Sequence, residues 1–403
     1  MTGNLRQDCP ICGGHQIAIL QKPERRDCFV TNGPEVGVCI GVCACKICGF
    51  IFLNPRMSTS EMIDYYSRQS RMPRKKISED SPLMQLMDIQ INLIQRNHPI
   101  KDGASVLEVG CAEGYFLNCI LEIKNNNVRI FGVEPSKRYA NAAIKLIPSG
   151  KFYNDVMEKV HFGKEKFDLI ILRHVLEHVQ SPIVNLEIVS DILNKNGCVY
   201  IEVPDVSIPV ETASHYFSHE HLSYFTLETL SATLARAGLK TIYADQFTAN
   251  PKNSGFDYPV LRAIAVAGSK MPENNYPDQP SVIWDRHLRA RERFFNDKLS
   301  PVLKRIENFS SHGKRLGIFG AGPHTMELLG KIQIPLTTWR VIFDNNPTKH
   351  GKRLRGIPIE KPTVDGLLGL DAILVSSNAF EGEIVAQLHE IAPKYLEILT
   401  IYQ

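Results

Sequence analysis

The stretch Val106-Leu-Glu-Val-Gly-Cys-Ala-Glu-Gly-Tyr-Phe-Leu117 decides the fold of the central part of the chain. A short apolar strand ends at Val109, a loop of small residues follows, and an amphipathic helix begins near Gly114. Gly110 lets a ligand approach the backbone closely, and Gly114 lets the start of the helix pack tightly. The pattern predicts the first strand, ligand-binding loop and helix of a parallel α/β sheet.

The same alternation of strand and helix extends outward from this stretch. The strand candidates are Val106–Val109, Ile130–Val133, Leu169–Leu172 and Val199–Val203. A proline-containing linker follows near residue 270, and one long charged helix is expected from Ile283 to about Asn308. Alternation then resumes at Arg315-Leu-Gly-Ile-Phe-Gly320, with later strands at Trp339–Phe343 and Ala372–Ser376. We therefore expect an α/β protein with a doubly wound sheet over residues 59–270 and a Rossmann-like domain over residues 271–403.

Length and composition fit this organisation and exclude several classes of protein. The chain has 403 residues, of which 43% are hydrophobic and 22% are charged. That length allows two or three domains. A net charge of +3 gives no electrostatic footprint for nucleic acid or an anionic membrane. The sequence contains no apolar run of about 20 residues and no apolar signal core at its start, so we expect a cytoplasmic location.

Cysteines are concentrated at the N-terminal end, where seven of the ten fall within the first 48 residues. Cys9-Pro-Ile-Cys12-Gly and Cys45-Lys-Ile-Cys48-Gly repeat one pattern, and four such thiolates complete a closed tetrahedral zinc shell. Residues 1–58 are therefore predicted to be an otherwise irregular zinc-binding domain with a structural metal. Replacement ligands are available at Cys28, Cys39 and Cys43. Reduced thiols without metal, or a redox dithiol, are the alternatives.

An acidic residue stands at the end of each of the first two strands. Glu134 follows Gly114 by 20 residues, a position from which a carboxylate can accept hydrogen bonds from a ribose diol. Glu108 would repel a pyrophosphate but suits a cationic cofactor. S-adenosylmethionine (SAM) carries a sulfonium and an amino group, so it fits this acidic rim.

These residues resemble the class I SAM-dependent methyltransferases over residues 100–245. Ala112 stands where the family's glycine motif usually has its middle glycine. The resemblance implies an adenine contact from Asp155 and a functional segment at the fourth strand, Phe167-Asp-Leu-Ile-Ile-Leu-Arg-His174. The implied cofactor-binding set is Glu108, Gly110, Ala112, Gly114, Glu134, Asp155, Arg173 and His174. A doubly wound domain without a ligand is the alternative.

Histidines gather after the fourth and fifth strands, at His174, His178, His215, His219 and His221. Ligands of a doubly wound sheet lie beyond the carboxyl ends of its strands, so these histidines are expected near the transferred methyl group. The run His219-Glu-His221 is not H-E-x-x-H, which excludes a zinc protease.

The three predicted domains together resemble the sugar C-methyltransferases, which methylate a carbon of a nucleotide-linked keto-deoxysugar. Glu220-His221-Leu-Ser-Tyr224-Phe225 matches their pattern, although Ser218 replaces a tyrosine. The resemblance implies His221 as general base, because a neutral imidazole works as a base near pH 7. Glu220 would orient His221 or bind a sugar hydroxyl. The implied catalytic set is His221, Glu220, His178, Tyr65, Tyr66 and Tyr224, with His178 and Tyr65 or Tyr66 donating hydrogen bonds to the enolate oxygen. A capped helix start is the alternative role for Glu220 and His221.

A second glycine loop, Gly317-Ile-Phe-Gly-Ala-Gly-Pro-His324, opens the C-terminal unit. Its helix start would present free N–H groups to an anion. The resemblance implies a domain that closes over the nucleotide portion of the substrate, through Gly320, Gly322, His324, Asp344 and Asn378. NAD binding, or a purely structural or dimerising role, are the alternatives.

The sequence thus predicts a SAM-dependent methyltransferase acting on a carbon of a nucleotide-diphosphate-linked keto-deoxysugar. O- or N-methylation of another glycan or small metabolite is the alternative activity, favoured by Ser218 and by the general form His174-Val-Leu-Glu-His178. A zinc-dependent scaffold with a vestigial SAM fold is the alternative outside enzymes, and the set Glu108, Gly110, Gly114 and Glu134 opposes it.

Overall fold

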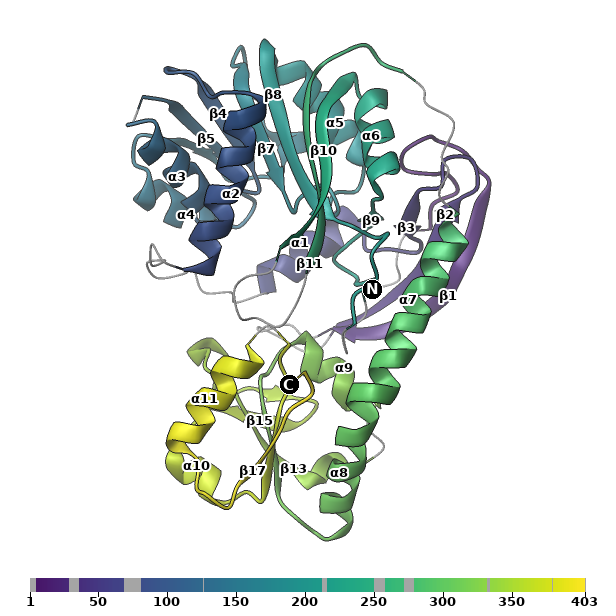
Figure 1. Cartoon of the computed structure of the whole chain (residues 1–403), viewed down its shortest axis with the longest axis vertical. Coiled ribbons are helices and arrows are strands. Elements are labelled where there is room, and N and C mark those ends of the chain that lie inside the picture. The colour runs from purple at the N-terminus through teal and green to yellow at the C-terminus, as the bar shows by residue number, and fades with distance from the viewer. Residues whose placement is uncertain are drawn as a thin grey trace.

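The computed structural model describes residues 5–28, 36–68, 81–125, 127–211, 216–249, 258–271, 279–331, 334–378 and 380–402. Within these residues the chain builds a four-stranded, a seven-stranded and a six-stranded sheet. Figure 1 shows the seven-stranded sheet with its helices at one end of the molecule and the six-stranded sheet at the other, with a long helical rod along one side.

The seven-stranded sheet carries the quoted stretch at its centre. Its strands are β4 (Ser105–Val109), β5 (Arg129–Val133), β6 (Lys151–Tyr153), β7 (Phe167–Arg173), β8 (Leu193–Pro204), β10 (Leu239–Ala249) and β11 (Tyr258–Ala267). Their order is β10-β11-β8-β7-β4-β5-β6, and only β11 runs antiparallel to its neighbours. This is the class I methyltransferase fold, as the sequence predicted. The order reverses between β4 and β7, which places a ligand crevice at the carboxyl ends of these two strands.

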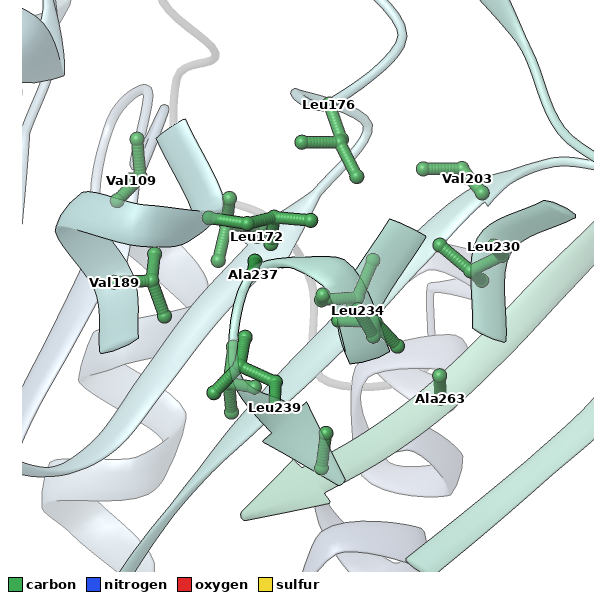
Figure 2. Close-up of a cluster of buried hydrophobic side chains, with 14 of the residues drawn as sticks. Val109, Leu172, Leu176, Val189, Val203, Leu230, Leu234, Ala237, Leu239 and Ala263 are labelled. Carbon is green, nitrogen blue, oxygen red and sulfur yellow. The ribbon is translucent and has the colours of Figure 1, made fainter. Parts of the chain in front are cut away.

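Helices cover both faces of this sheet. They are α2 (Pro82–Asn97), α3 (Tyr115–Ile123), α4 (Lys137–Leu146), α5 (Pro182–Ile192) and α6 (Leu227–Arg236), with the 3₁₀ turn η1 (Met157–Lys159). Ser81, Ser136, Ser181 and Thr226 cap the starts of α2, α4, α5 and α6 through their side-chain oxygens. The close-up in Figure 2 shows Val189 of α5 and Leu234 of α6 among buried side chains from the sheet. This packing holds the carboxyl ends of the strands in fixed positions.

The N-terminal block is more regular than the sequence suggested. A long antiparallel hairpin, β1 (Ile17–Cys28) with β2 (Val36–Cys45), leads into β3 (Ile51–Leu53). The polar, proline-containing β1 has no clean alternation of apolar residues, and its register shifts twice. The expectation of an irregular block was therefore wrong. The fourth strand of the sheet is β9 (Ser223–Tyr224), which pairs with β3 and connects this sheet to the predicted acceptor loop. Helix α1 (Thr59–Arg68) follows β3 in the chain.

The six-stranded sheet has the predicted Rossmann-like form. Its strands are β12 (Leu316–Phe319), β13 (Trp339–Phe343), β14 (Arg353–Leu354), β15 (Ile357–Glu360), β16 (Ala372–Val375) and β17 (Glu397–Leu399), in the order β14-β15-β13-β12-β16-β17. Its helices are α9 (Pro323–Lys331), α10 (Val364–Leu368) and α11 (Glu381–Ile391), with the 3₁₀ turns η3 (Leu336–Thr338) and η4 (Pro347–Lys349).

The predicted long charged helix forms the rod at the side of the molecule in Figure 1. It comprises α7 (Pro280–Phe294), a π turn η2 (Phe295–Leu299) and α8 (Ser300–Ser311). Pro301 has no N–H to donate, which accounts for the widened turn just before it. Part of the predicted linker, residues 272–278, lies outside the described residues.

The boundaries of the three predicted domains stay predictions, since β9 of the central region also belongs to the N-terminal sheet. In the part of the chain that the structure describes, no helix is both long and apolar enough to cross a membrane.

Candidate active site

The glycine loop after β4 has the backbone conformation that a closely approaching ligand requires. Gly110 (φ +68°), Ala112 (φ +46°) and Gly114 (φ +82°) all occupy the left-handed region. A Cβ on Gly110 would lie 2.6 Å from Val175 Cγ2, which is too close, so only glycine fits there. The loop is anchored by the Gly110 amide, which donates to the Val133 carbonyl at 2.8 Å.

Glu134 ties this loop to the end of β5. Its carboxylate accepts the amide of Ala112 at 3.0 Å and that of Ser136 at 2.8 Å. Burial raises the pKa of Glu134, and the two amides oppose this rise. Asn154, which the sequence analysis missed, donates from Nδ2 to the Glu134 and Pro135 carbonyls at 2.9 Å each. These bonds hold the turn that carries Asp155, the predicted adenine contact, against the backbone of Glu134 and Pro135.

Glu108 is buried at the end of β4 (2% exposed) beneath the loop. Arg173 donates from Nε to Glu108 Oε1 at 3.2 Å and from Nη1 to Gln90 Oε1 at 2.7 Å. Among the described residues, Glu108 Oε2 has no hydrogen-bond partner. Burial raises the pKa of Glu108 to about 7, although Arg173 opposes the shift. A buried carboxylate with an unsatisfied oxygen fits a cationic ligand, as SAM binding requires.

His174 bridges two buried carboxylates just beyond β7. Its Nδ1 lies 3.3 Å from Glu177 Oε1 and its Nε2 lies 3.2 Å from Glu202 Oε1. Burial lowers the pKa of His174, but its hydrogen bonds with the two carboxylates prevail and raise it to about 10. These contacts favour the imidazolium form of His174, which together with Arg173 pairs with buried carboxylates. Their predicted contacts with the cofactor stay predictions.

Glu202 and Gln90 belong to this network, and the sequence analysis missed both. Gln90 Nε2 donates to the two Glu202 oxygens at 2.8 Å each, and the Tyr200 hydroxyl donates to Glu202 at 2.8 Å. The signal was visible for Glu202, because it is the one acidic residue in the apolar strand Val199-Tyr-Ile-Glu-Val203.

His178 and His221 meet above Glu177, which joins them in one cluster. The two rings are 4.8 Å apart between centroids, and His178 Nε2 lies 3.7 Å from Glu177 Oε1. Burial and the neighbouring His178 lower the pKa of His221 to about 4. Burial would raise the pKa of Glu177, but His178 and His174 lower it to about 2. The cluster therefore contains an ionised carboxylate and a neutral imidazole near pH 7.

Backbone contacts hold the two loops of this cluster together. The Glu177 carbonyl accepts the amides of Leu222 and Ser223 at 2.7 and 3.1 Å. His178 Nδ1 lies 2.8 Å from the carbonyl of Glu220. A carbonyl only accepts, so Nδ1 carries the proton. The structure thus gives a role to the backbone of Glu220, whereas the predicted role of its half-buried side chain stays a prediction.

The predicted tyrosines occupy different positions around these loops. Tyr65 of α1 is 2% exposed and packs edge-on against His219 at 4.9 Å. Tyr224 is also buried, and its hydroxyl donates to the Ser218 carbonyl at 3.2 Å, so it braces the loop. The side chain of Tyr66 and all of His215 lie outside the described residues.

The four predicted metal ligands form one cluster. Cys9, Cys12, Cys45 and Cys48 come together, with Sγ–Sγ distances of 3.5 Å for Cys9–Cys48 and for Cys12–Cys45. Four Zn–S bonds of about 2.3 Å in a tetrahedron would place the sulfurs about 3.8 Å apart. Hydrogen bonds with Cys48 and Cys9 lower the pKa of Cys45, whereas the contacts with Cys45 raise the pKa of Cys9 and of Cys48. The donor set therefore suits zinc.

The alternative ligands are not part of that cluster. Cys43 lies in β2 with its Sγ 3.8 Å from the Asn54 carbonyl, and Cys39 lies further along the same strand. The side chain of Cys28 is outside the described residues. The nine cysteines described are all free thiols, so no disulfide competes for the ligands among them.

The second glycine loop shows the same anchoring as the first. The Gly320 amide donates to the Phe343 carbonyl at 2.7 Å, and Asp344 accepts the Ala321 and Asn346 amides at 2.8 Å each. Lys349, missed in the sequence, donates to Asp344 Oδ2 at 2.9 Å and to the Ala321 carbonyl at 2.8 Å.

His324 is buried beside that loop with both ring nitrogens engaged. Its Nδ1 lies 2.8 Å from Ser376 Oγ and its Nε2 lies 2.7 Å from the Tyr402 hydroxyl. These bonds favour a positioning role for His324. Asn378 lies half-buried just past β16, at the same edge of the sheet as Gly320 and Gly322. Substrate binding by these residues stays a prediction.

The chain is similar in sequence to known methyltransferases. Residues 86–244 match a family described as a methyltransferase domain. The chain is 23% identical over 346 residues to the C-methyltransferase NovU of Streptomyces niveus, covering 82% of this chain and 78% of that protein. It is 22% identical over 130 residues to a ubiquinone biosynthesis O-methyltransferase of Leptothrix cholodnii, covering 31% of this chain and 54% of that protein. Among solved structures, the [4+2]-cyclase SpnF matches with a TM-score of 0.40 at 13% identity, covering 50% of this chain and 88% of that one.

The fold, the donor loop and the matched domain together define the class of enzyme. The chain contains a class I methyltransferase domain and is a SAM-dependent methyltransferase.

Proposed function

We propose that this enzyme methylates a carbon atom of a nucleotide-diphosphate-linked keto-deoxysugar. The observation that carries the proposal is the joining of His221, His178 and Glu177 in one cluster beyond the carboxyl ends of β7 and β8. Carbon becomes nucleophilic only after a proton α to the ketone is removed, and this cluster has the groups for that step. The likeness to a C-methyltransferase over 82% of the chain supports the same reaction.

His221 is the proposed general base. Its pKa of about 4 keeps the imidazole neutral near pH 7, so its lone pair is available for the acceptor's α-proton. The proton then resides on His221, and Glu177 and Glu220 are the carboxylates that favour its charged form. The low pKa makes His221 a weak base, so stabilisation of the enolate must also lower the barrier to proton removal.

His178 is the proposed donor to the developing enolate oxygen. Its Nδ1 proton is committed to the Glu220 carbonyl, so a second proton on Nε2 is needed for donation. The ionised Glu177 at 3.7 Å compensates the resulting positive charge. Tyr65 is the second proposed donor, and Tyr224 fixes the loop that carries His221.

The donor loop and Glu134 are the proposed SAM-binding residues, with Glu108 beneath them as the counter-charge. When bound, SAM supplies the electrophilic methyl group. The chain's contribution is to align the two reactants and exclude water. Zinc in the four-cysteine cluster is proposed to be structural, because it would hold the N-terminal sheet that pairs with β9.

The test is a transfer assay with SAM that carries a deuterated methyl group. Nucleotide-linked 4-keto-6-deoxysugars serve as acceptors, and mass spectrometry and carbon NMR locate the label. We expect the label on a ring carbon. His221→Gln should lower kcat by about 10²–10⁴-fold while SAM affinity persists.

His161→Gln is the matched control, because this exposed histidine precedes β7 at the opposite edge of the sheet. Label on oxygen or nitrogen would overturn the proposal in favour of O- or N-methylation. Unchanged turnover in His221→Gln would overturn the assignment of His221 as the base.

A further inference from the structure

The cluster of Glu177, His178 and His221 has a second property, which the proposed proton transfer does not use. Each residue offers one ligand atom, and the three atoms all lie within 4.8 Å of one another. They come from two loops that the Glu177 carbonyl joins through the Leu222 and Ser223 amides. This group is separate from the four-cysteine cluster.

Two contacts around these side chains are of the kind found around metal ligands. A metal-bound histidine usually donates its other ring N–H to a carbonyl or carboxylate, which fixes the tautomer. His178 Nδ1 does this toward the Glu220 carbonyl at 2.8 Å, leaving Nε2 as the ligand atom of the neutral ring. The neighbouring His174 likewise holds Glu177 Oε1 at 3.3 Å.

Glu177 also supplies an unsatisfied oxygen. Its side chain is 1% exposed, and Oε2 has no hydrogen-bond partner among the residues that the structure describes. A buried carboxylate oxygen without a partner is unfavourable, and a cation next to it removes the deficit.

We propose that Glu177, His178 and His221 bind one divalent transition-metal ion of the zinc class, and that this ion inhibits methyl transfer. Two imidazoles and one carboxylate suit Zn²⁺ or Co²⁺, whereas Mg²⁺ and Ca²⁺ prefer oxygen ligands throughout. Three protein ligands leave at least one coordination position open. The inhibition rests on the proposed function, because the ion would occupy the lone pair of His221; the binding itself does not.

The experiment titrates Co²⁺ into the full-length protein that already holds one equivalent of zinc. Cobalt bound by thiolates gives a sulfur-to-metal charge-transfer band, so a site of histidine and carboxylate ligands is distinguished by d–d absorption without that band. We expect one additional equivalent in the wild type. His221→Gln and Glu177→Gln should each weaken this binding at least about tenfold, and His161→Gln should not change it.

Activity is measured separately with added Zn²⁺ and then with a chelator. We expect loss of turnover that the chelator reverses. No additional equivalent, or one that His221→Gln and Glu177→Gln leave unchanged, would overturn the metal site. Binding without inhibition would overturn the inhibitory role, and it would count against His221 as the base. The Co²⁺ titration does not depend on the acceptor, so a failure to label carbon in the acceptor assay would leave its result unaffected.

Discussion

The two glycine loops of this enzyme share a backbone design and differ in charge. In each, an amide after the first strand donates to the last residue of the second strand, Gly110 to Val133 and Gly320 to Phe343. The next residue in each case, Glu134 or Asp344, accepts one loop amide and the amide two positions further on.

The charges around the loops then diverge. Glu108 lies buried under the first loop, whereas the aligned position before Gly320 is the apolar Ile318. Lys349 neutralises Asp344 in the second loop, and nothing comparable is bound to the Glu134 carboxylate among the described residues. The same fold unit thus has a buried carboxylate beneath the loop in one place and a lysine–aspartate ion pair at the loop in the other, so the glycine pattern alone does not specify the ligand.

The largest expected effect comes from removing the negative charge of the first loop. Glu134→Gln should weaken SAM binding about 10–150-fold, since hydrogen bonds to a charged group contribute about 1.5–3 kcal/mol. Asp344→Asn is the matched change in the second loop and should leave SAM affinity unchanged. Calorimetric titration measures both. Equal losses in the two variants would mean that the loops do not divide the ligands as argued.

Adding a methyl group to the second loop should destabilise the C-terminal domain at one glycine and leave it almost unchanged at the other. Gly320 has φ +111°, and a Cβ there would lie 2.8 Å from the Ser376 carbonyl oxygen. Gly320→Ala should therefore destabilise the C-terminal domain by about 1–3 kcal/mol. Gly322→Ala, where no described atom lies within 4 Å of the added Cβ, should change stability by less than about 1 kcal/mol. Urea unfolding followed by tryptophan fluorescence measures the difference; Trp339 of β13 and Trp284 of α7 both contribute to the signal.

The control is the SAM affinity of Gly320→Ala and Gly322→Ala. Because the first loop is separate, both alanine variants should bind SAM like the wild type. A large loss of SAM affinity in Gly320→Ala would show that the second loop supports the first.

The sequence predicts the local strand, turn and helix of each loop better than it predicts the contacts that the loop residues make. The strand, glycine turn and helix of each loop are encoded locally, and β4, β5 and β13 form where the apolar runs predicted them. The pairing of Cys9 and Cys12 with Cys45 and Cys48 was also predictable, because two C-x-x-C turns have few other uses in one short block.

The ion pairs that determine the charge around the two loops were not predictable in the same way. Lys349 lies in the 3₁₀ turn η4, which brings its amino group to Asp344. His174, just past β7, contacts Glu202 on the neighbouring strand β8. The first contact is local but follows an irregular turn, the second depends on tertiary packing, and neither leaves a periodic signal in the sequence. The β1–β2 hairpin was missed because β1 is polar and bulged, so alternation fails there.

A smaller effect should appear in the pH dependence of SAM binding. Burial raises the pKa of Glu108 to about 7, so this carboxyl is largely neutral below pH 7 and ionised above it. SAM is cationic, so its affinity should fall as pH decreases from 8 to 6, by up to about tenfold. Glu108→Gln should remain at the low affinity and lose this pH dependence. Calorimetry at several pH values checks both; an unchanged slope in the variant would assign the titration to another group.

The smallest expected effect tests the second loop directly. Lys349→Met leaves Asp344 uncompensated and removes a cation from the loop where the sequence predicts that the nucleotide portion of the substrate binds. We expect KM for the nucleotide-linked acceptor to rise about 3–10-fold, the range of a partly exposed charge contact. Turnover and SAM affinity should stay constant, and Lys349→Arg should restore part of the loss.

Lys394→Met provides the matched control, because this exposed lysine precedes β17 at the opposite edge of the same sheet. It removes the same net charge without touching the loop. If both lysine variants raise KM equally, the effect comes from the overall charge of the domain. If only Lys349→Met does so, the two glycine loops bind ligands of opposite charge within one chain.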